Sequence, residues 1–336
     1  MAVEKKRRGL ISVQLLRGIA ALLVITYHIS VKAEQKGLAQ EHYFSIGSCG
    51  VDLFFIISGF IMCYTTNVNT TCKSFIESRL TRVFPPYWIL TTIALIVFII
   101  KPSLVNSSGG NTSILASYFL LPTGDKFLVQ NGWTLSYEMV FYFFYALCLY
   151  FVPNRKNLAT CFVLLILFAS GYMFDSKENP FLSFIFNDLF LEFVLGILAF
   201  EIHKRYSFNF ITSAFTLLLS VAMLVLFNGA FSGYRVIFFG IPMFLLFISV
   251  LNLEGYLHKQ SKLSFLGDIS YSLYLVHPFV LSPIAMILIV IGVQSNILFF
   301  AILMSVSIMA SYVFYQKIEY PITRKIKGLT KKYVMG

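Results

Sequence analysis

The stretch that decides the fold is LISVQLLRGIAALLVITYHIS, which runs from Leu10 to Ser30. It is mostly apolar, and an apolar stretch of about 17–25 residues is long enough to cross a bilayer as a helix. The residues before it are basic (Lys5–Arg8), and no A-x-A-like cleavage site follows it. Because a cleaved signal peptide would carry such a site, we expect a retained membrane-spanning helix.

The rest of the chain has the same apolar character. Apolar residues make up 58% of the 336 positions and charged residues only 12%, against about 25% charged residues in an average soluble domain. This composition excludes a cytoplasmic enzyme, a disordered chain and a nucleic-acid-binding domain. The five cysteines are scattered without the spacing of a disulfide framework or a zinc site, and we expect no metal.

Ten segments have the length and apolarity of a membrane span. We therefore predict an all-α fold: a polytopic membrane helical bundle of about ten transmembrane helices. Residues 1–336 are expected to form a single domain, with the spans within 10–316 and a short basic tail at 317–336. The predicted spans are Leu10–Ser30, Ile46–Thr66, Phe84–Lys101, Asn131–Val152, Leu158–Phe174, Phe181–His203, Phe210–Phe227, Tyr234–Leu251, Asp268–Gly292 and Asn296–Gln316.

Lysine and arginine residues are unevenly distributed between the connecting segments. If the N-terminus lies in the cytoplasm, the cytoplasmic segments hold most of the 26 Lys and Arg residues. Because cytoplasmic loops of membrane proteins carry this excess, we expect both termini to be cytoplasmic. The net charge of +11 is then mostly this bias, so we expect the lipid bilayer, and no nucleic acid, as a partner.

Two ionisable residues, Arg17 and His28, lie within the first span. Their spacing of eleven residues is about 20° more than three full helical turns, so both side chains share one face, about 16 Å apart. Ionisable residues inside a membrane are costly and usually face a cavity or a partner. The alternative is an arginine that reaches the interface and a hydrogen-bonded core histidine.

Two acidic residues fall in the outer halves of predicted spans. Asp52 is early in the second span, at a depth similar to that of His28, and the two could pair; a carboxylate would fix the imidazole tautomer. The alternative for Asp52 is a carboxylate that stabilises a helix N-terminus. Glu138 lies in the outer half of its own span. These positions favour a polar cavity open to the outer face.

Two further patterns involve basic and imidazole side chains. Arg79 and Arg82, three residues apart, share a helix face at the predicted inner end of the third span, and two guanidinium groups there suit a phosphate. The alternative is ordinary positive-inside anchoring. His277 lies in mid-span beside the helix-kinking Pro278, and its spacing from Tyr274 places both residues on the same helix face.

Taken together in order and spacing, these motifs resemble the acyltransferase-3 family of membrane proteins. The resemblance runs from residue 10 to about 325. It rests on Arg17 and His28, the block Gly50–Phe60, Arg79-x-x-Arg82 before Pro85-x-Tyr87-Trp88, Trp133–Glu138, Ser270–His277 and Glu319-Tyr320-Pro321.

The resemblance implies a reaction and roles for these residues. Many members of the family transfer an acetyl group from acetyl-CoA to sugars of lipopolysaccharide O-antigen, exopolysaccharide, capsule or peptidoglycan. By this resemblance His28 is the general base, Arg17 its motif partner, and Arg79 with Arg82 binds acyl-CoA. We add Asp52 and Glu138 to the expected catalytic group. The expected substrate-binding residues are Trp133, Ser136, Tyr274 and His277.

The sequence therefore predicts an O-acetyltransferase of the bacterial inner membrane that acts on a surface polysaccharide or its lipid-linked precursor. A transporter or flippase for an envelope glycan is the main alternative, because many spans and intramembrane charges fit that class too. A membrane glycosyltransferase or polymerase is a second alternative. The acceptor sugar and the acyl chain are not specified by the sequence.

Overall fold

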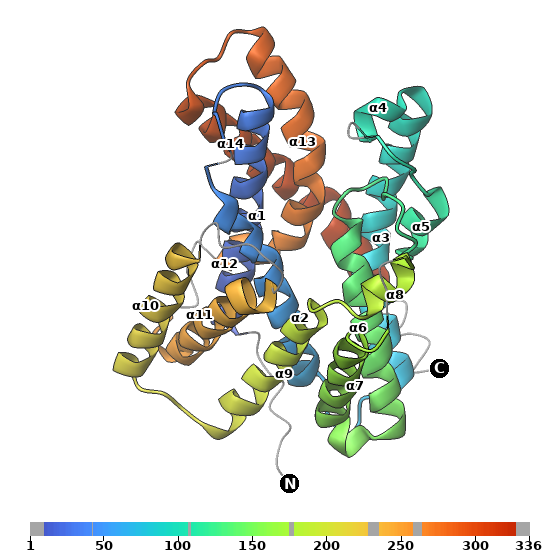
Figure 1. Ribbon diagram of the computed structural model, residues 1–336, viewed down its shortest axis with the longest axis vertical. Coiled ribbons are helices and arrows are strands. Elements are labelled where there is room, and N and C mark those ends of the chain that lie inside the picture. The colour runs from blue at the N-terminus through green and yellow to red at the C-terminus, as the bar shows by residue number, and fades with distance from the viewer. Residues whose placement is uncertain are drawn as a thin grey trace. The chain divides into compact units, whose positions relative to one another are not determined.

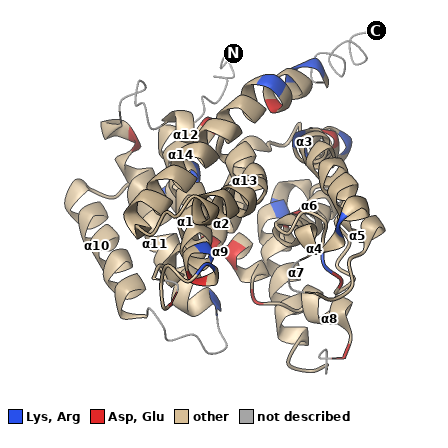
Figure 2. Ribbon diagram, turned by 90° about the horizontal axis from the view of Figure 1, so that it is seen from above, with Lys and Arg blue, Asp and Glu red and all other residues tan. Residues whose placement is uncertain are grey.

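A computed structural model describes residues 10–41, 43–106, 109–174, 178–227, 235–257 and 264–326. Within these ranges the elements are all helices, and the one β-type contact is an isolated bridge between Thr112 and Lys126. The predicted all-α class is confirmed (Figure 1). Charged residues are few along the helices (Figure 2), as the composition requires. The basic tail beyond residue 326 lies outside the described residues.

Eight helical segments are long and apolar enough to cross a membrane, so the chain is a multi-pass membrane protein. Two of the ten predicted spans are shorter helices: α7 (Lys156–Ser170) has 15 residues and α10 (Phe210–Leu226) has 17. At 1.5 Å per residue they extend about 23–26 Å, less than a typical hydrocarbon core of about 30 Å. The eight long segments, among the described residues, are Ile11–Gln35, Ser45–Thr65, Cys72–Ile100, Gly132–Phe151, Pro180–Arg205, Val236–Tyr256, Ser270–Val290 and Asn296–Ile326.

The chain divides into two compact units. Unit 1 comprises residues 1–24, 45–69 and 191–270; unit 2 comprises residues 25–44, 70–190 and 271–336. The helix α1 (Ile11–Gln35) contributes its first half to unit 1 and its second half to unit 2. Each unit is described separately below.

Unit 1 is held together by close helix approaches at glycines. A Cβ added at Gly59 would lie 2.3 Å from the Phe193 carbonyl oxygen, and one at Gly196 would lie 2.1 Å from that of Ile56. Small residues at such contacts let membrane helices approach closely. The helices of this unit are α2 (Gly50–Thr65), α9 (Phe190–Arg205), α10, η3 (Val236–Gly240), α11 (Ile241–Asn252), η4 (Leu253–Tyr256) and α12 (Ser264–Asp268).

In unit 1, polar side chains form hydrogen bonds that link one helix to another. The Glu254 carboxylate accepts hydrogen bonds from the backbone N–H groups of Ile11 and Ser12, at 2.8 and 2.7 Å, and so caps the start of α1. The neighbouring helices α10 and α11 (Figure 1) are linked by the Thr216 and Ser249 hydroxyls, 2.6 Å apart.

Unit 2 is built around α3, α6 and α7, which lie side by side (Figure 1). The Tyr87 hydroxyl of α3 donates to the Ser117 carbonyl at 2.7 Å, and the Tyr271 hydroxyl of α13 donates to the Val83 carbonyl at 2.7 Å. The helices here are α3 (Cys72–Ile100), α4 (Pro102–Val105), α5 (Ile114–Phe119), α6 (Gly132–Phe151), η2 (Pro153–Arg155), α7, α8 (Pro180–Ile185), α13 (Ser270–Val290), α14 (Asn296–Phe314) and η5 (Tyr315–Glu319).

Helix α3 starts twelve residues before the predicted span. It begins at Cys72, where the Thr71 hydroxyl accepts a hydrogen bond from the Ser74 N–H at 3.2 Å. The helix continues through Pro85 and Pro86, which the sequence analysis treated as part of its beginning. Prolines are tolerated inside membrane helices because neighbouring groups satisfy the freed backbone. As a result, both arginines of the pair lie within α3, before the predicted span.

Candidate active site

Two imidazole rings from distant helices meet in unit 2. His28 of α1 and His277 of α13 have ring centroids 5.2 Å apart, with the ring planes tilted by 35°. His277 is fully buried, and Tyr274, one turn earlier, contacts its ring with centroids 6.0 Å apart. The sequence analysis selected both histidines but gave no reason to place them together.

The protonation of His277 follows from its hydrogen bond. Its Nδ1 atom lies 3.0 Å from the Leu273 carbonyl oxygen, which can only accept. Nδ1 therefore carries the proton in the neutral ring, and Nε2 has a free lone pair. Nε2 is buried and has no hydrogen-bond partner among the described residues. This atom can accept a hydrogen bond or a proton beside His28.

A buried hydrogen-bond network joins α13 to the start of α6. The hydroxyls of Thr134 and Tyr274 are 2.7 Å apart, and Thr134 donates to the Asn131 carbonyl at 2.9 Å. The Asn131 side-chain amide donates to the Tyr274 carbonyl at 2.6 Å. The sequence analysis selected Tyr274 and missed Asn131 and Thr134. One sequence signal did exist, because Pro278 stands four residues after Tyr274 and leaves its carbonyl without the helical donor.

The two other predicted substrate-binding residues lie on the first turns of α6. Ser136 is buried and donates to the Gly132 carbonyl of its own helix at 3.3 Å. Trp133 is 38% exposed, and its ring meets that of Tyr137 edge-on with centroids 6.1 Å apart. Neither takes part in the Asn131–Thr134–Tyr274 network, so their assignment stays a prediction.

Arg79 and Glu138 also belong to unit 2. The Tyr142 hydroxyl donates to Oε1 of Glu138, one turn earlier on α6. Arg79 interacts electrostatically with both Tyr142 and Glu138 and with its neighbour Arg82, and its guanidinium lies 5.7 Å from the centroid of the Phe75 ring. Arg79 Nε is buried without a hydrogen-bond partner among the described residues. A predicted anion-binding residue and a predicted catalytic acid therefore share one network.

Arg17 lies in unit 1, near the end of α12. Its Nη1 donates to the Gln14 side-chain oxygen at 3.3 Å. Burial raises the pKa of the Asp268 carboxyl above its usual value, and the positive charge of Arg17 opposes that rise. The two elements meet closely, because a Cβ at Gly267 would lie 2.1 Å from the Gln14 carbonyl oxygen. Arg17 thus has an acidic neighbour that sequence reasoning did not identify.

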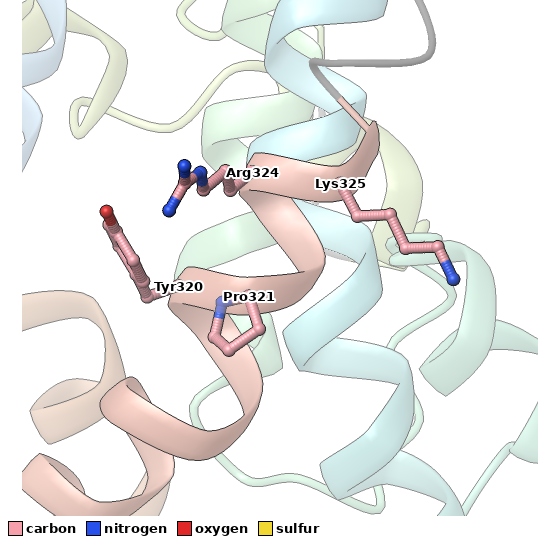
Figure 3. A pocket seen from close by; sticks show the side chains of 4 residues that line it. All are labelled: Tyr320, Pro321, Arg324 and Lys325. Atoms are coloured by element: carbon pink, nitrogen blue, oxygen red, sulfur yellow. The ribbon is translucent and has the colours of Figure 1, made fainter.

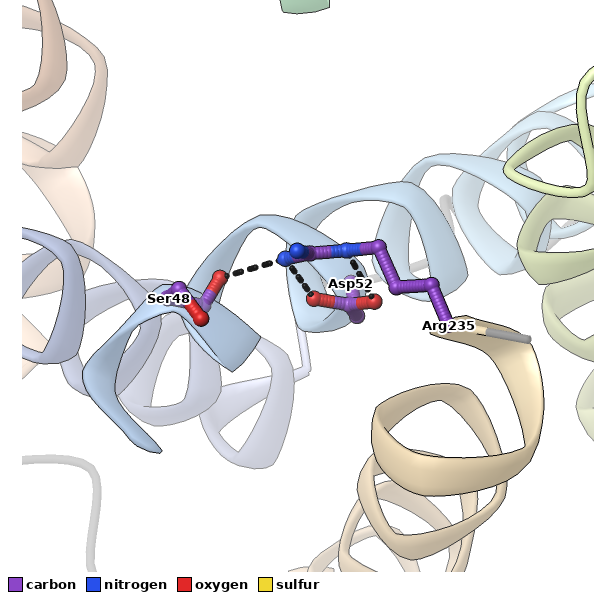
Figure 4. A network of polar contacts seen from close by, with 3 residues as sticks. All are labelled: Ser48, Asp52 and Arg235. Carbon is purple, nitrogen blue, oxygen red and sulfur yellow. Dashed lines mark hydrogen bonds and ion pairs between the residues drawn. The ribbon is translucent and has the colours of Figure 1, made fainter. Parts of the chain in front are cut away.

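Asp52 is engaged in a two-point ion pair within unit 1 (Figure 4). Arg235 donates from Nε to Oδ1 at 2.9 Å and from Nη2 to Oδ2 at 2.6 Å, and Nη2 also donates to the Ser48 carbonyl at 2.8 Å. Asp52 is fully buried. From the sequence we considered a pair of Asp52 with His28. The structure gives Asp52 a different partner, because the π-helical turn η3 brings Arg235 to α2.

An open surface hollow of about 450 Å³ lies on the helical extension of α14 in unit 2. It is lined by Tyr320, Pro321, Arg324 and Lys325 (Figure 3). The Tyr320 ring and the Arg324 side chain lie on the same side of the helix, and Lys325 extends to the other side (Figure 3). All four residues come from two turns of one helix, so the hollow is enclosed on few sides. Within the described ranges, no group of three or more His, Cys, Asp or Glu residues could hold a metal.

A family model described as an acyltransferase domain, acyltransferase-3, matches residues 10–316. The chain belongs to the acyltransferase-3 family. This protein is therefore a membrane acyltransferase, and the histidine pair and the buried arginine of unit 2 become its candidate catalytic and binding groups.

Three proteins illustrate what the chain is similar to in sequence. The exopolysaccharide production protein ExoZ of Rhizobium meliloti is 31% identical over 315 residues, 88% of this chain and 95% of that protein. The O-acetyltransferase OatA of Staphylococcus aureus is 25% identical over 92% of this chain and 56% of its own length. The acyltransferase MdmB of Streptomyces mycarofaciens is 28% identical over 38% of this chain and 36% of its own. No solved structure matches the chain significantly.

Proposed function

We propose that this acyltransferase moves an acetyl group from acetyl-CoA to a sugar hydroxyl of a cell-surface polysaccharide or of its lipid-linked precursor. Its family membership and the similarity to ExoZ and OatA, whose names refer to exopolysaccharide production and O-acetyl transfer, support the reaction class. The observation that carries the proposal is the pair of imidazoles, His28 and His277, joined in one compact unit by helices far apart in sequence.

His28 is the general base in this proposal. The acceptor hydroxyl oxygen attacks the thioester carbonyl carbon, a C–O bond forms, and the C–S bond breaks. His28 takes the hydroxyl proton as the oxygen attacks and returns it to the CoA sulfur as it leaves. A positioned base of this kind contributes about 10²–10⁴-fold to a rate. A neutral imidazole is suited to the task because burial disfavours the charged ring.

The donor would be held by the arginine pair of α3. The phosphates of acetyl-CoA are anionic, and the guanidinium fork of Arg79 and Arg82 matches them. Glu138, linked to Arg79 through Tyr142, is proposed to hold that guanidinium in place before the donor binds. Arg17 and Asp52 are proposed to support the fold of unit 1 around α1 and α2. We place the protein in the bacterial inner membrane with both termini in the cytoplasm.

The test is transfer of radiolabelled acetyl from acetyl-CoA to envelope glycans in membranes that contain matched amounts of each protein. The wild type should label the glycan, and His28→Ala should not. His203→Ala is the matched control, because His203 is a histidine of α9 in unit 1 and is not part of the compact unit that holds His28 and His277. Label in His28→Ala would remove His28 as the base. No label with any protein, on membranes rich in acceptors, would favour the transporter or flippase.

A further inference from the structure

Helix α13 contains a proline, Pro278, directly after His277. In an α-helix the carbonyl of residue i accepts from the N–H of residue i+4. Pro278 has no N–H, so the carbonyl of Tyr274 lacks the i+4 backbone donor of a regular α-helix. Inside a membrane protein such a carbonyl needs another partner, because no bulk water can supply one.

Asn131 supplies the missing donor. Its Nδ2 lies 2.6 Å from the Tyr274 carbonyl oxygen, and Asn131 and Tyr274 are 3% and 7% exposed. Asn131 stands directly before α6, where asparagine commonly caps its own helix through its side chain. Here its side chain makes no capping bond to α6. The amide instead donates to the Tyr274 carbonyl of α13, which lies 143 positions later in the sequence.

The carbonyl held by Asn131 is next to the one that holds His277. The Leu273 carbonyl accepts from Nδ1 of His277 at 3.0 Å, and the Tyr274 carbonyl is also within hydrogen-bonding reach of that ring. With Tyr274 occupied by Asn131, the imidazole N–H has Leu273 as its main acceptor. If Asn131 were absent, the Tyr274 carbonyl would lose the Asn131 hydrogen bond, compete more strongly for the same N–H and turn the ring.

We propose that Asn131 is a positioning residue for acyl transfer: it replaces the donor that Pro278 removes and thereby keeps the His277 ring beside His28 with Nε2 available to accept. His28 then donates its own ring N–H to Nε2, and its other ring nitrogen takes the hydroxyl proton. This role rests on the proposed function, because it concerns the same histidine pair.

The central experiment is a rescue by a second substitution. Asn131→Ala should lower kcat about tenfold, which corresponds to 1.4 kcal/mol, with the KM for acetyl-CoA unchanged. Pro278→Ala restores a backbone N–H that can bond the Tyr274 carbonyl. Asn131→Ala/Pro278→Ala should therefore have a kcat within about threefold of Pro278→Ala alone. An effect of Asn131→Ala that does not act through the Tyr274 carbonyl would not be recovered by a backbone N–H on another helix.

Three outcomes overturn the proposal. The first is a wild-type kcat in Asn131→Ala, and the second is a folded double variant that is no more active than Asn131→Ala. The third comes from ¹⁵N NMR of protein labelled at its five histidines. The signal lost in His277→Ala should show the Nδ1-protonated tautomer in the wild type and change in Asn131→Ala; an unchanged signal contradicts the role. Because the NMR experiment requires no turnover, it separates this failure from a wild type without transferase activity, which refutes the proposed function.

Discussion

The ion pair between Asp52 and Arg235 allows us to predict that substituting one partner destabilises the fold more than substituting the other. Asp52 is fully buried, whereas the Arg235 side chain is 25% exposed. Removing one partner of a buried ion pair costs about 3–5 kcal/mol, because the other charge is left without compensation. Arg235→Ala should reach this range. It strands a fully buried carboxylate and also removes the cation that interacts with Glu192.

Asp52→Ala should be less harmful than Arg235→Ala. The remaining guanidinium keeps its bond to the Ser48 carbonyl, its interaction with Glu192 and its partial exposure to solvent. The double variant Asp52→Ala/Arg235→Ala should recover part of the loss, because neither charge is stranded. Non-additivity of this kind is what a direct interaction produces in a double-mutant cycle.

The assay is thermal unfolding of the purified protein in detergent, followed by the fraction that stays monodisperse after heating. At about 2–4 °C per kcal/mol for a large domain, Arg235→Ala should lower Tm by about 6–20 °C. Arg205→Ala is the control, because its ion pair with Glu201 is exposed and such pairs contribute about 0–1 kcal/mol. Equal Tm values for Arg235→Ala and Arg205→Ala, or a double variant less stable than both single ones, would refute the reasoning.

Three further predictions concern the site and the packing. His277→Ala should lower kcat for acetyl transfer at least a hundredfold in the fraction that remains folded; activity near wild type would exclude the ring from catalysis. Arg79→Ala should raise the KM for acetyl-CoA, and an unaltered saturation curve would contradict its role. Gly59→Ala and Gly196→Ala should each reduce the yield of folded protein, because each new Cβ would fall within 2.3 Å of a backbone oxygen; Gly255→Ala, with nothing within 4 Å, is the control for both.

The fold class was predictable because the bilayer imposes a simple rule on sequence. A span must be apolar and long, so stretches such as Leu10–Ser30 are visible without any tertiary information. The same rule does not locate the start of a helix that extends beyond its apolar stretch. Pro85 and Pro86 are typical of a helix beginning in a soluble protein, yet within α3 their missing donors are tolerated. Helix α3 therefore begins at Cys72 and includes Arg79, and the location of Arg79 at the inner membrane surface stays a prediction.

The partners of the buried polar groups were much harder to predict. Asp52 plainly needs a cation, but the chain has 26 Lys and Arg residues, and the one that binds it lies 183 positions away. The same holds for Asn131, whose acceptor is a backbone atom that no side-chain pattern encodes. Here the spacing of Pro278 from Tyr274 identifies the carbonyl in need of a donor, and only the fold identifies the donor.

The unpaired atoms are as informative as the paired ones. Buried polar atoms in folded proteins nearly always have hydrogen-bond partners, so each exception requires a reason. Among the described residues, the buried side-chain nitrogens without one are Arg79 Nε and His277 Nε2, and both lie in unit 2. One belongs to a group suited to phosphate, and the other to the ring beside the proposed base His28. A structural role alone would favour partners for both, whereas a site that binds an anionic donor and positions a base requires polar atoms that are not already engaged elsewhere in the fold.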